Sequence, residues 1–189
     1  MAGVIFKHTV DAFLQQVVLR RKLLSARELE SFQLQRARDV DLETWVKLLK
    51  LSAQRLSPHK NEADALEDVG REMLRGYAEG MVGRGLFIVL RLLGPKKALV
   101  RMADNYRTAD NMTSAKVVDR GPTEVEVEFN STGGMPTYVR GVISESLVLL
   151  DVAGATVDLV SETPEGTRYA VRWPAVRPSR PTFGRQLRR

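Results

Sequence analysis

The segment from Gly70 to Pro95 constrains the fold more than any other, because it contains six of the fourteen glycines in this 189-residue chain. Its apolar spacing is helical. A glycine inside a helix destabilises it by about 1 kcal/mol relative to alanine. The three glycines in the first part of the segment, Gly70, Gly76 and Gly80, therefore predict that another backbone or a ligand approaches that helix closely.

This segment is expected to form two helices separated by a break near Gly83 and Gly85. The first begins near Asn61, and the residues on its buried face follow a spacing of three and four: Leu66, Val69, Gly70, Met73, Tyr77 and Met81. The second, residues 84–93, is apolar on nearly every side, which predicts the central buried helix of the fold. Pro95 then suits the first turn of another helix.

Three shorter helices are predicted before residue 61, each from a capping residue at its start. Thr9 and Asp41 can each cap a helix with apolar residues at helical spacing. Ser25 and Glu28 form a capping-box pattern, in which each side chain can bind the backbone of the other residue.

After Asn111 the apolar pattern changes to a period of two, which is typical of strands. Residues 114–119 and 123–129 predict one hairpin, and residues 155–161 and 168–173 predict a second after an intervening helix. Glu124 and its alternate neighbours form a polar face, which Arg168 and Arg172 are expected to meet from the adjacent strand. We expect a single α+β domain over residues 1–173, with an N-terminal helical layer packed on one face of a four-stranded antiparallel sheet.

The positive charge of the chain is concentrated in its last sixteen residues. The net charge is +6, and segment 174–189 contributes five positive charges and no negative ones, leaving about +1 for the rest. This segment is rich in proline, so we expect a flexible tail that either is simply solvated or binds an anionic partner. Its basic residues are Arg177, Arg180, Arg185, Arg188 and Arg189.

The composition indicates a soluble, cytoplasmic protein. The chain contains no cysteine, which is typical of a reducing compartment and excludes disulfides and thiolate chemistry. No signal-peptide pattern is present at the N-terminus. The longest strongly apolar stretch, residues 86–93, is much shorter than the ~20 residues of a membrane-spanning helix.

No pattern in the sequence indicates catalysis, a metal site or a cofactor. The two histidines, His8 and His59, lie about fifty residues apart and fit no metal-binding spacing. The glycines of segment 80–85 follow a helix rather than a strand and lack the ending of a phosphate-binding loop. We therefore expect a protein that is not an enzyme, with no catalytic residue, no metal and no cofactor.

A cluster of apolar and aromatic residues around the glycine-rich helices could line one side of a pocket, closed by the helix near residue 140. The same residues could instead fill a core. The polar segment 105–111 either satisfies helix-end carbonyls or forms a rim that recognises a partner. The candidate pocket residues are Tyr77, Met81, Leu86, Phe87, Leu90, Met102, Tyr106, Val139 and Val142.

The order of these parts resembles a large paralogous family of myxobacterial proteins of unknown function. The resemblance rests on VIFKHTVDAF, DVDLETWVKLL and the glycine-rich run GREMLRGYAEGMVGRGLFIVLRLLGPKKALVRMADNYRTADNMT, followed by two strands, a helix near Tyr138 and two strands ending in YAVRW. It covers residues 4–173. The plan is similar to that of a superfamily that includes TRAPP vesicle-tethering subunits, the vinyl-reductase-type ligand-binding domain and the haem-nitric-oxide-binding domain.

The resemblance implies an α+β fold with a pocket between helices and sheet, and dimers formed through the N-terminal helices. The haem-binding relatives need an axial histidine late in the helical part. This chain has no histidine after His59, so haem binding by that route is not expected.

Two functional hypotheses follow. The main one is a non-enzymatic regulatory or adaptor protein in signalling, which binds other proteins and forms a homodimer. The alternative is a sensor that binds a small apolar ligand between helices and sheet. Nucleic acid or an anionic membrane is expected as a partner only through the tail.

Overall fold

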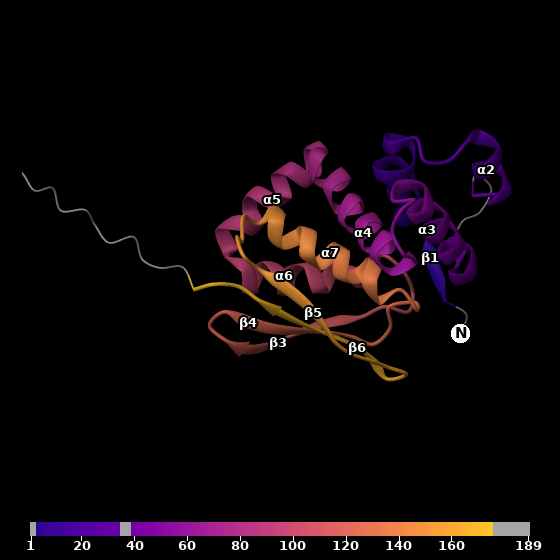
Figure 1. The fold of residues 1–189 in the computed structure, drawn as a ribbon. Coiled ribbons are helices and arrows are strands. Elements are labelled where there is room, and N and C mark those ends of the chain that lie inside the picture. Colours follow the sequence, from indigo (N-terminus) through magenta and orange to yellow (C-terminus); the bar gives the residue numbers. More distant parts are fainter. Residues whose placement is uncertain (1–2, 35–38, 176–189) are drawn as a thin grey trace, which may run out of the picture.

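The computed structural model describes residues 3–34 and 39–175 (Figure 1). The five tail arginines lie outside the described residues. In chain order the elements are β1 (Val4–Phe6), α1 (Lys7–Phe13), the π-helix η1 (Leu14–Leu19), α2 (Ala26–Ser31), β2 (Asp39–Asp41), α3 (Leu42–Leu56), α4 (Glu62–Glu79), α5 (Met81–Leu93), α6 (Pro95–Asn105), the 3-10 helix η2 (Tyr106–Thr108), β3 (Ala115–Gly121), β4 (Glu124–Phe129), α7 (Pro136–Leu149), β5 (Thr156–Thr163) and β6 (Gly166–Arg172).

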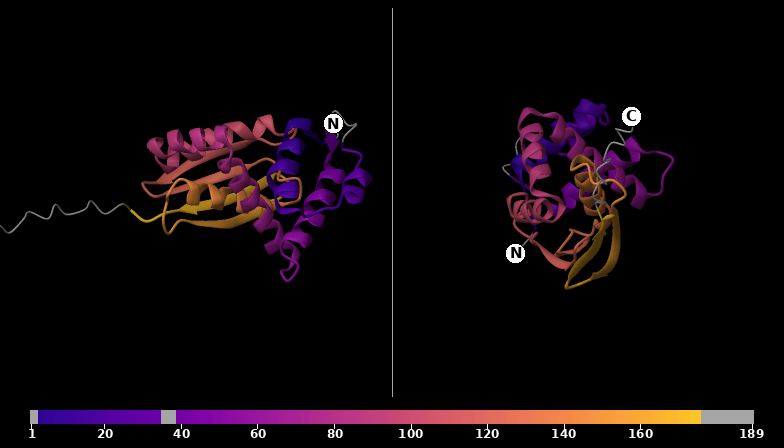
Figure 2. Two further views of the ribbon diagram at one scale, coloured as in Figure 1. Left: turned by 90° about the horizontal axis from the view of Figure 1, so that it is seen from above. Right: turned by 90° about the vertical axis from the view of Figure 1, so that its left-hand side faces the viewer.

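The predicted fold class is confirmed: helices cover one face of an antiparallel sheet whose strand order is β3-β4-β6-β5. Helices α6 and α7 lie directly on the sheet, and α4 and α5 lie above them (Figure 1). The N-terminal elements gather at one end of the molecule, as the two further views also show (Figure 2). The buried side chains of β4 and β6 include Val125, Val127 and Tyr169, which pack against α6 and α7.

The outer face of the sheet carries the charged pairs that the alternation predicts. Glu124 pairs in register with Arg172, and their side chains lie 2.9 Å apart. Arg168 lies 3.6 Å from Glu126. The arginines of these pairs are half exposed, whereas the Glu126 side chain is largely buried. The more exposed pair, Glu124 with Arg172, stabilises the fold by less than about 1 kcal/mol and mainly favours the observed strand register.

The N-terminus differs from its prediction, because it contains a short two-stranded sheet. Strand β1 precedes the first helices and β2 follows them, and the two pair antiparallel. Helix α1 begins at Lys7 and has no side-chain cap. The hydroxyl of Thr9, the expected cap, donates instead to the carbonyl of Ala109 over 2.9 Å. The predicted caps at Ser25 and Asp41 are confirmed, and so is the helix start near Asn61, where the Asn61 side chain caps α4.

Helices α4 and α7 cross with their backbones in contact. A Cβ placed on Gly70 would lie 2.1 Å from the carbonyl oxygen of Tyr138, and one on Gly141 would lie 2.1 Å from the carbonyl oxygen of Glu67. Gly76 makes a similar approach, since its Cβ would lie 2.5 Å from the carbonyl of Gln16 in η1. The predicted backbone contact is therefore confirmed at Gly70 and Gly76.

The helix break falls at Gly80, not near Gly83 and Gly85. Gly80 has extended dihedrals and caps both α4 and α5. Gly83 lies inside α5, where a Cβ would be 2.0 Å from the carbonyl of Tyr77, so its small size allows the sharp turn between the helices. The prediction that 84–93 is the central buried helix is also wrong, because α5 lies at the surface and buries only one side.

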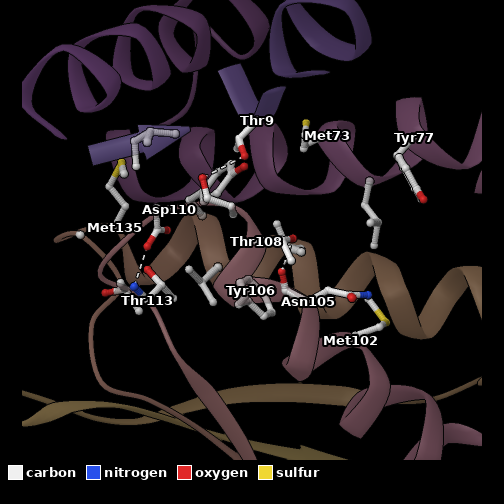
Figure 3. Close-up of a pocket in the computed structure, with 18 of the residues that line it drawn as sticks. Thr9, Met73, Tyr77, Met102, Asn105, Tyr106, Thr108, Asp110, Thr113 and Met135 are labelled. Carbon is white, nitrogen blue, oxygen red and sulfur yellow. Dashed lines mark hydrogen bonds between the residues drawn. The ribbon is translucent and has the colours of Figure 1, made fainter. Parts of the chain in front are cut away.

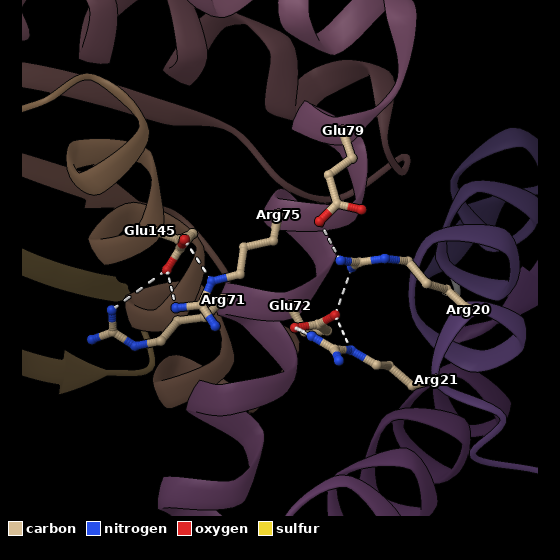
Figure 4. Close-up of polar contacts among 7 residues, drawn as sticks. All are labelled: Arg20, Arg21, Arg71, Glu72, Arg75, Glu79 and Glu145. Carbon is tan, nitrogen blue, oxygen red and sulfur yellow. Dashed lines mark hydrogen bonds and ion pairs between the residues drawn. The ribbon is translucent and has the colours of Figure 1, made fainter.

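Two buried glutamates connect the helices through arginines (Figure 4). Glu72 on α4 is 3% exposed and accepts hydrogen bonds from Arg20 and Arg21 at the end of η1. Glu145 on α7 is 2% exposed and receives two bonds from Arg75 of α4, at 2.7 and 2.9 Å. Such charge-assisted pairs fix the orientation of the helices that they join.

We expect Gly70→Ala to lower the free energy of unfolding by about 2 kcal/mol or more, because the new methyl group meets a backbone carbonyl that cannot move alone. Urea denaturation measures this loss. Gly85→Ala is the matched control, since a Cβ there meets nothing within 4 Å and alanine favours the helix by about 1 kcal/mol. Equal effects of the two substitutions would contradict the crossing geometry.

We expect Glu72→Gln to destabilise the fold by about 2 kcal/mol, because Arg20 and Arg21 lose the charge that neutralises them. The loss is smaller than for a fully buried pair, since both arginines are partly exposed. Glu79→Gln, which removes an exposed partner of Arg20, should cost less than about 1 kcal/mol in the same urea titration. A larger loss at Glu79 would show that burial does not set the strength of these pairs.

Candidate functional site

A cavity of about 500 Å³ lies between the N-terminal elements and helices α4 to α7 (Figure 3). This volume is within the ~300–1,000 Å³ range of sites for small organic ligands. Its wall is formed by the following residues: Ile5, Thr9, Leu42, Trp45, Met73, Leu74, Tyr77, Leu86, Phe87, Leu90, Met102, Asn105, Tyr106, Thr108, Ala109, Asp110, Met112, Thr113, Ser131, Thr132, Gly133, Met135, Tyr138, Val139 and Val142.

Most of the candidate pocket residues lie around this cavity, and Met81 does not. The residues brought together are Tyr77, Leu86, Phe87, Leu90, Met102, Tyr106, Val139 and Val142. Met81 follows the break at Gly80, so it belongs to the first turn of α5 and not to the buried face of α4, and its side chain is 91% exposed.

The resemblance implied a pocket between the helices and the four-stranded sheet. The cavity instead does not adjoin that sheet. No described residue of β3 to β6 forms part of its wall. Tyr106 stands between, with its ring packed edge-on against Phe129 of β4 at a centroid distance of 4.8 Å. Phe129 in turn contacts Tyr169 of β6 edge-on, so the face of the sheet is covered by packed aromatic rings.

Two parts of the wall were not predicted. Ile5, Leu42 and Trp45 come from the N-terminal layer, and their approach depends on tertiary packing that no local pattern reveals. The loop between β4 and α7 contributes Gly133 and Met135. Gly133 has φ +60°, and a Cβ there would lie 3.0 Å from the Leu42 side chain, so this loop packs closely on the N-terminal layer. The pair of glycines in that loop is the one local sequence feature that could have indicated its contribution to the cavity wall.

The polar segment 105–111 binds both the neighbouring backbone and the N-terminal elements. The Thr108 hydroxyl donates to the carbonyl of Asn105 over 2.7 Å, which satisfies a helix-end carbonyl as one of the two interpretations predicted. The Asp110 carboxylate accepts the amides of Met112 and Thr113 at 2.8 and 2.5 Å. The segment also binds β1, since the Phe6 amide donates to the Ala109 carbonyl over 3.1 Å.

Tyrosine hydroxyls supply hydrogen-bonding capacity to the cavity, whose wall includes Tyr77, Tyr106 and Tyr138. Tyr106 and Tyr138 line it with half-buried rings, and no residue in the described part of the chain hydrogen-bonds their hydroxyls. Burial raises the pKa of both phenols well above the usual 10.0, and the proximity of Tyr138 raises the pKa of Tyr106 further. Both groups are therefore protonated at neutral pH and can donate. Tyr169 differs, because its hydroxyl donates to the Pro136 carbonyl over 2.7 Å.

Solved structures with a similar fold include H-NOX domains. One is an oxygen-binding H-NOX domain related to soluble guanylate cyclases, in its oxygen complex; it is 15% identical, with 96% of this chain and 99% of that chain covered at a TM-score of 0.64. A mutant H-NOX domain of T. Tengcongensis is also 15% identical, with 89% and 96% covered and a TM-score of 0.61. At such identities the likeness shows the fold, which is H-NOX-like.

A third similar structure, which concerns the tuning of haem redox potential by porphyrin distortion, is 16% identical, with 89% of this chain and 98% of that chain covered and a TM-score of 0.64. Among curated proteins, none matches this chain in sequence.

The cavity of this chain does not fit a histidine-ligated haem. Its described lining contains no histidine, and it contains no lysine or arginine to neutralise the haem carboxylates. The thioether of Met102 is a haem ligand type that pairs with histidine in cytochromes c, and no histidine lines the cavity beside it. The described residues also hold no group of three or more acidic, histidine or cysteine residues suited to a metal ion.

The family assignment comes from the sequence as a whole. The model of the family described as "Protein of unknown function (DUF2378)" matches residues 3–174, which include every element of the fold from β1 to β6. The segments that first suggested a family are therefore parts of one continuous match. This chain belongs to the DUF2378 family, and its fold is that of the H-NOX domains.

Proposed function

We propose that this protein is a sensor that binds a small, uncharged and largely apolar molecule in the cavity between the N-terminal elements and α4–α7. The observation that carries this proposal is the cavity itself, an apolar space of about 500 Å³ in a domain of this size. The H-NOX-like fold supports it, because the similar structures include a domain that binds oxygen.

The lining favours an adaptable apolar ligand. Four methionines, Met73, Met102, Met112 and Met135, contribute to the wall. Methionine side chains are flexible and polarizable, so they adjust to the shape of a bound molecule. The aromatic rings of Trp45 and Phe87 add flat apolar surface.

The polar groups of the lining favour a neutral ligand with a hydrogen-bond acceptor. The phenols of Tyr106 and Tyr138 can donate to such an acceptor, and leaving them without one in an apolar site is unfavourable. The described lining contains no lysine or arginine to pair with an anionic ligand, and the Asp110 carboxylate accepts two backbone amides. An uncharged molecule with a carbonyl or ether oxygen meets these conditions.

We also propose that the role is binding rather than catalysis, and that the adaptor hypothesis applies to the outer surface. The exposed apolar side chains of α5 support a protein partner there.

A cytoplasmic location, a myxobacterial origin and kinship with TRAPP subunits remain predictions of the sequence. No helix in the described ranges is long and apolar enough to cross a membrane.

Native mass spectrometry of the purified protein, followed by the same measurement under denaturing conditions, tests for a ligand retained from the cell.

Binding of Nile red, a neutral dye with a carbonyl acceptor, tests the cavity directly. We expect Val142→Trp, which fills the cavity, to weaken dye binding at least tenfold. Val148→Trp on the same helix is the control, since Val148 is exposed and lies outside the cavity wall. Equal binding by both variants would refute the site.

Tyrosine-to-phenylalanine substitutions separate binding from stability. We expect Tyr106→Phe to leave the free energy of unfolding unchanged within about 0.5 kcal/mol, because no described group loses a hydrogen bond, and to weaken Nile red binding. Tyr169→Phe should instead lower the free energy of unfolding by about 1 kcal/mol, because it removes the bond to Pro136. Thermal or urea unfolding and a dye titration measure the two effects. A stability loss at Tyr106 would show that its hydroxyl has a structural role.

A further inference from the structure

The outer face of α5 exposes a continuous apolar stripe. Met81, Val82 and Leu92 are 91%, 76% and 84% exposed, and Ile88 and Val89 are also more than half exposed. At 3.6 residues per turn these five positions fall on one side of the helix. By contrast, Leu19 is the one large exposed apolar side chain among the described residues of α1, η1, α2 and α3. The apolar surface available to a partner is therefore on α5, not on the N-terminal helices.

A glycine occupies the centre of this stripe. Gly85 lies at the centre of the angular range that the five exposed positions span, and a Cβ there would meet no described atom within 4 Å. Gly70, Gly76 and Gly83 each have a backbone atom pressed against them, and Gly85 has none among the residues that the structure describes. A glycine in mid-helix lowers helix stability by about 1 kcal/mol, and its known structural benefit is close approach of a second backbone.

The spacing of the stripe is the same in both directions along the helix. Met81, Gly85, Ile88 and Leu92 are separated by four, three and four residues. If two copies of α5 pack antiparallel, Ile88 of each copy lies over Gly85 of the other, and Met81 lies against Leu92. A large side chain then meets the small one at both central positions, as a two-fold symmetric contact requires.

We propose that α5 is a homodimer interface, in which two copies of this helix pack antiparallel and cross at Gly85 and Ile88. The exposed side chains of the stripe, together with the half-exposed Leu93, present several hundred Å² of apolar surface. That is on the order of the ~800 Å² that each partner buries in a standard interface. A second copy is favoured over other partners because the stripe is complementary to itself.

The charged residues of α5 do not obstruct this contact. Arg84 and Arg91 lie together on one flank of the helix. Each is bound within its own chain: Arg84 donates to the carbonyl of Glu79 over 2.9 Å, and Arg91 to the carbonyl of Leu149 over 2.7 Å. Arg91 also pairs with Asp151 at 3.2 Å. The interface is therefore apolar, and the dimer should persist at high salt.

Analytical ultracentrifugation of the full chain over a range of concentrations tests the proposal. We expect twice the 21.2 kDa monomer mass at micromolar concentration. Ile88→Gln should raise the dimer dissociation constant at least tenfold, because each dimer buries two such side chains. Val160→Gln, at a valine 51% exposed on the sheet strand β5, should leave it unchanged. A wild-type protein that stays monomeric to about 100 μM, or equal effects of both variants, would overturn the proposal.

Gly85→Ala distinguishes a defect in association from a defect in folding. In the isolated chain the added methyl group meets open space, so the monomer should be as stable as the wild type or more so. At the crossing the added methyl group separates the two helices, so the dimer dissociation constant should be higher than that of the wild type. A variant that dimerises as tightly as the wild type would show that α5 does not cross at Gly85.

Disulfide trapping tests the orientation, and the absence of native cysteine makes it clean. A mixture of Met81→Cys and Leu92→Cys proteins should form a mixed covalent dimer on mild oxidation, because these positions meet in the antiparallel pair. Met81→Cys alone should not cross-link efficiently. Rapid cross-linking of Met81→Cys to itself, without the mixed product, would overturn the antiparallel arrangement.

Discussion

The contact between the backbones of α4 and α7 is the constraint on which the rest of the molecule depends. Gly70 and Gly141 each lie against a carbonyl of the opposite helix, so neither helix can shift outward without losing close packing along its length. Helix α7 rests on the sheet, while α4 carries the N-terminal elements and leads into α5. The buried Glu145 and Glu72 then fix α4 to its two neighbours with arginines on both sides. The positions of the helices therefore depend on this one crossing of α4 and α7.

The same crossing determines the shape of the cavity. Met73, Leu74 and Tyr77 follow Gly70 at intervals of three, four and seven residues, so they lie on the face of α4 that touches α7 at the glycine. On α7, Tyr138 and Val142 flank Gly141 and also line the cavity. The two helices touch at their glycines, which have no side chains, and they separate where residues with large side chains follow. The width of the cavity between them is thus set by the size of the lining residues one turn away from the contact.

Most of the fold could be predicted from local patterns, because its caps, hairpins and periodicities are local. The capping box at Ser25, the helix starts at Asn61 and Pro95, and both hairpins are of this kind. The candidate pocket residues other than Met81 line the cavity because they lie on helices with periodic apolar faces. Three features could not be found this way: the break at Gly80, where a neighbouring glycine is needed for the turn; the surface position of α5, whose composition is that of a buried helix; and the N-terminal wall with Trp45, which depends on β1 bonding to residues 109–111.

Helix α5 is a wall only one helix thick, and each side of it has a different proposed function. Leu86, Phe87 and Leu90 face the cavity, while Ile88 and Leu92 face outward. In the proposed dimer, a molecule that shifts this helix from within would alter the surface that the second copy meets. Thermodynamic linkage makes the effect reciprocal: the factor by which a ligand changes self-association equals the factor by which self-association changes the ligand's affinity. The concentration of the protein itself would then set how sensitively it responds to its ligand.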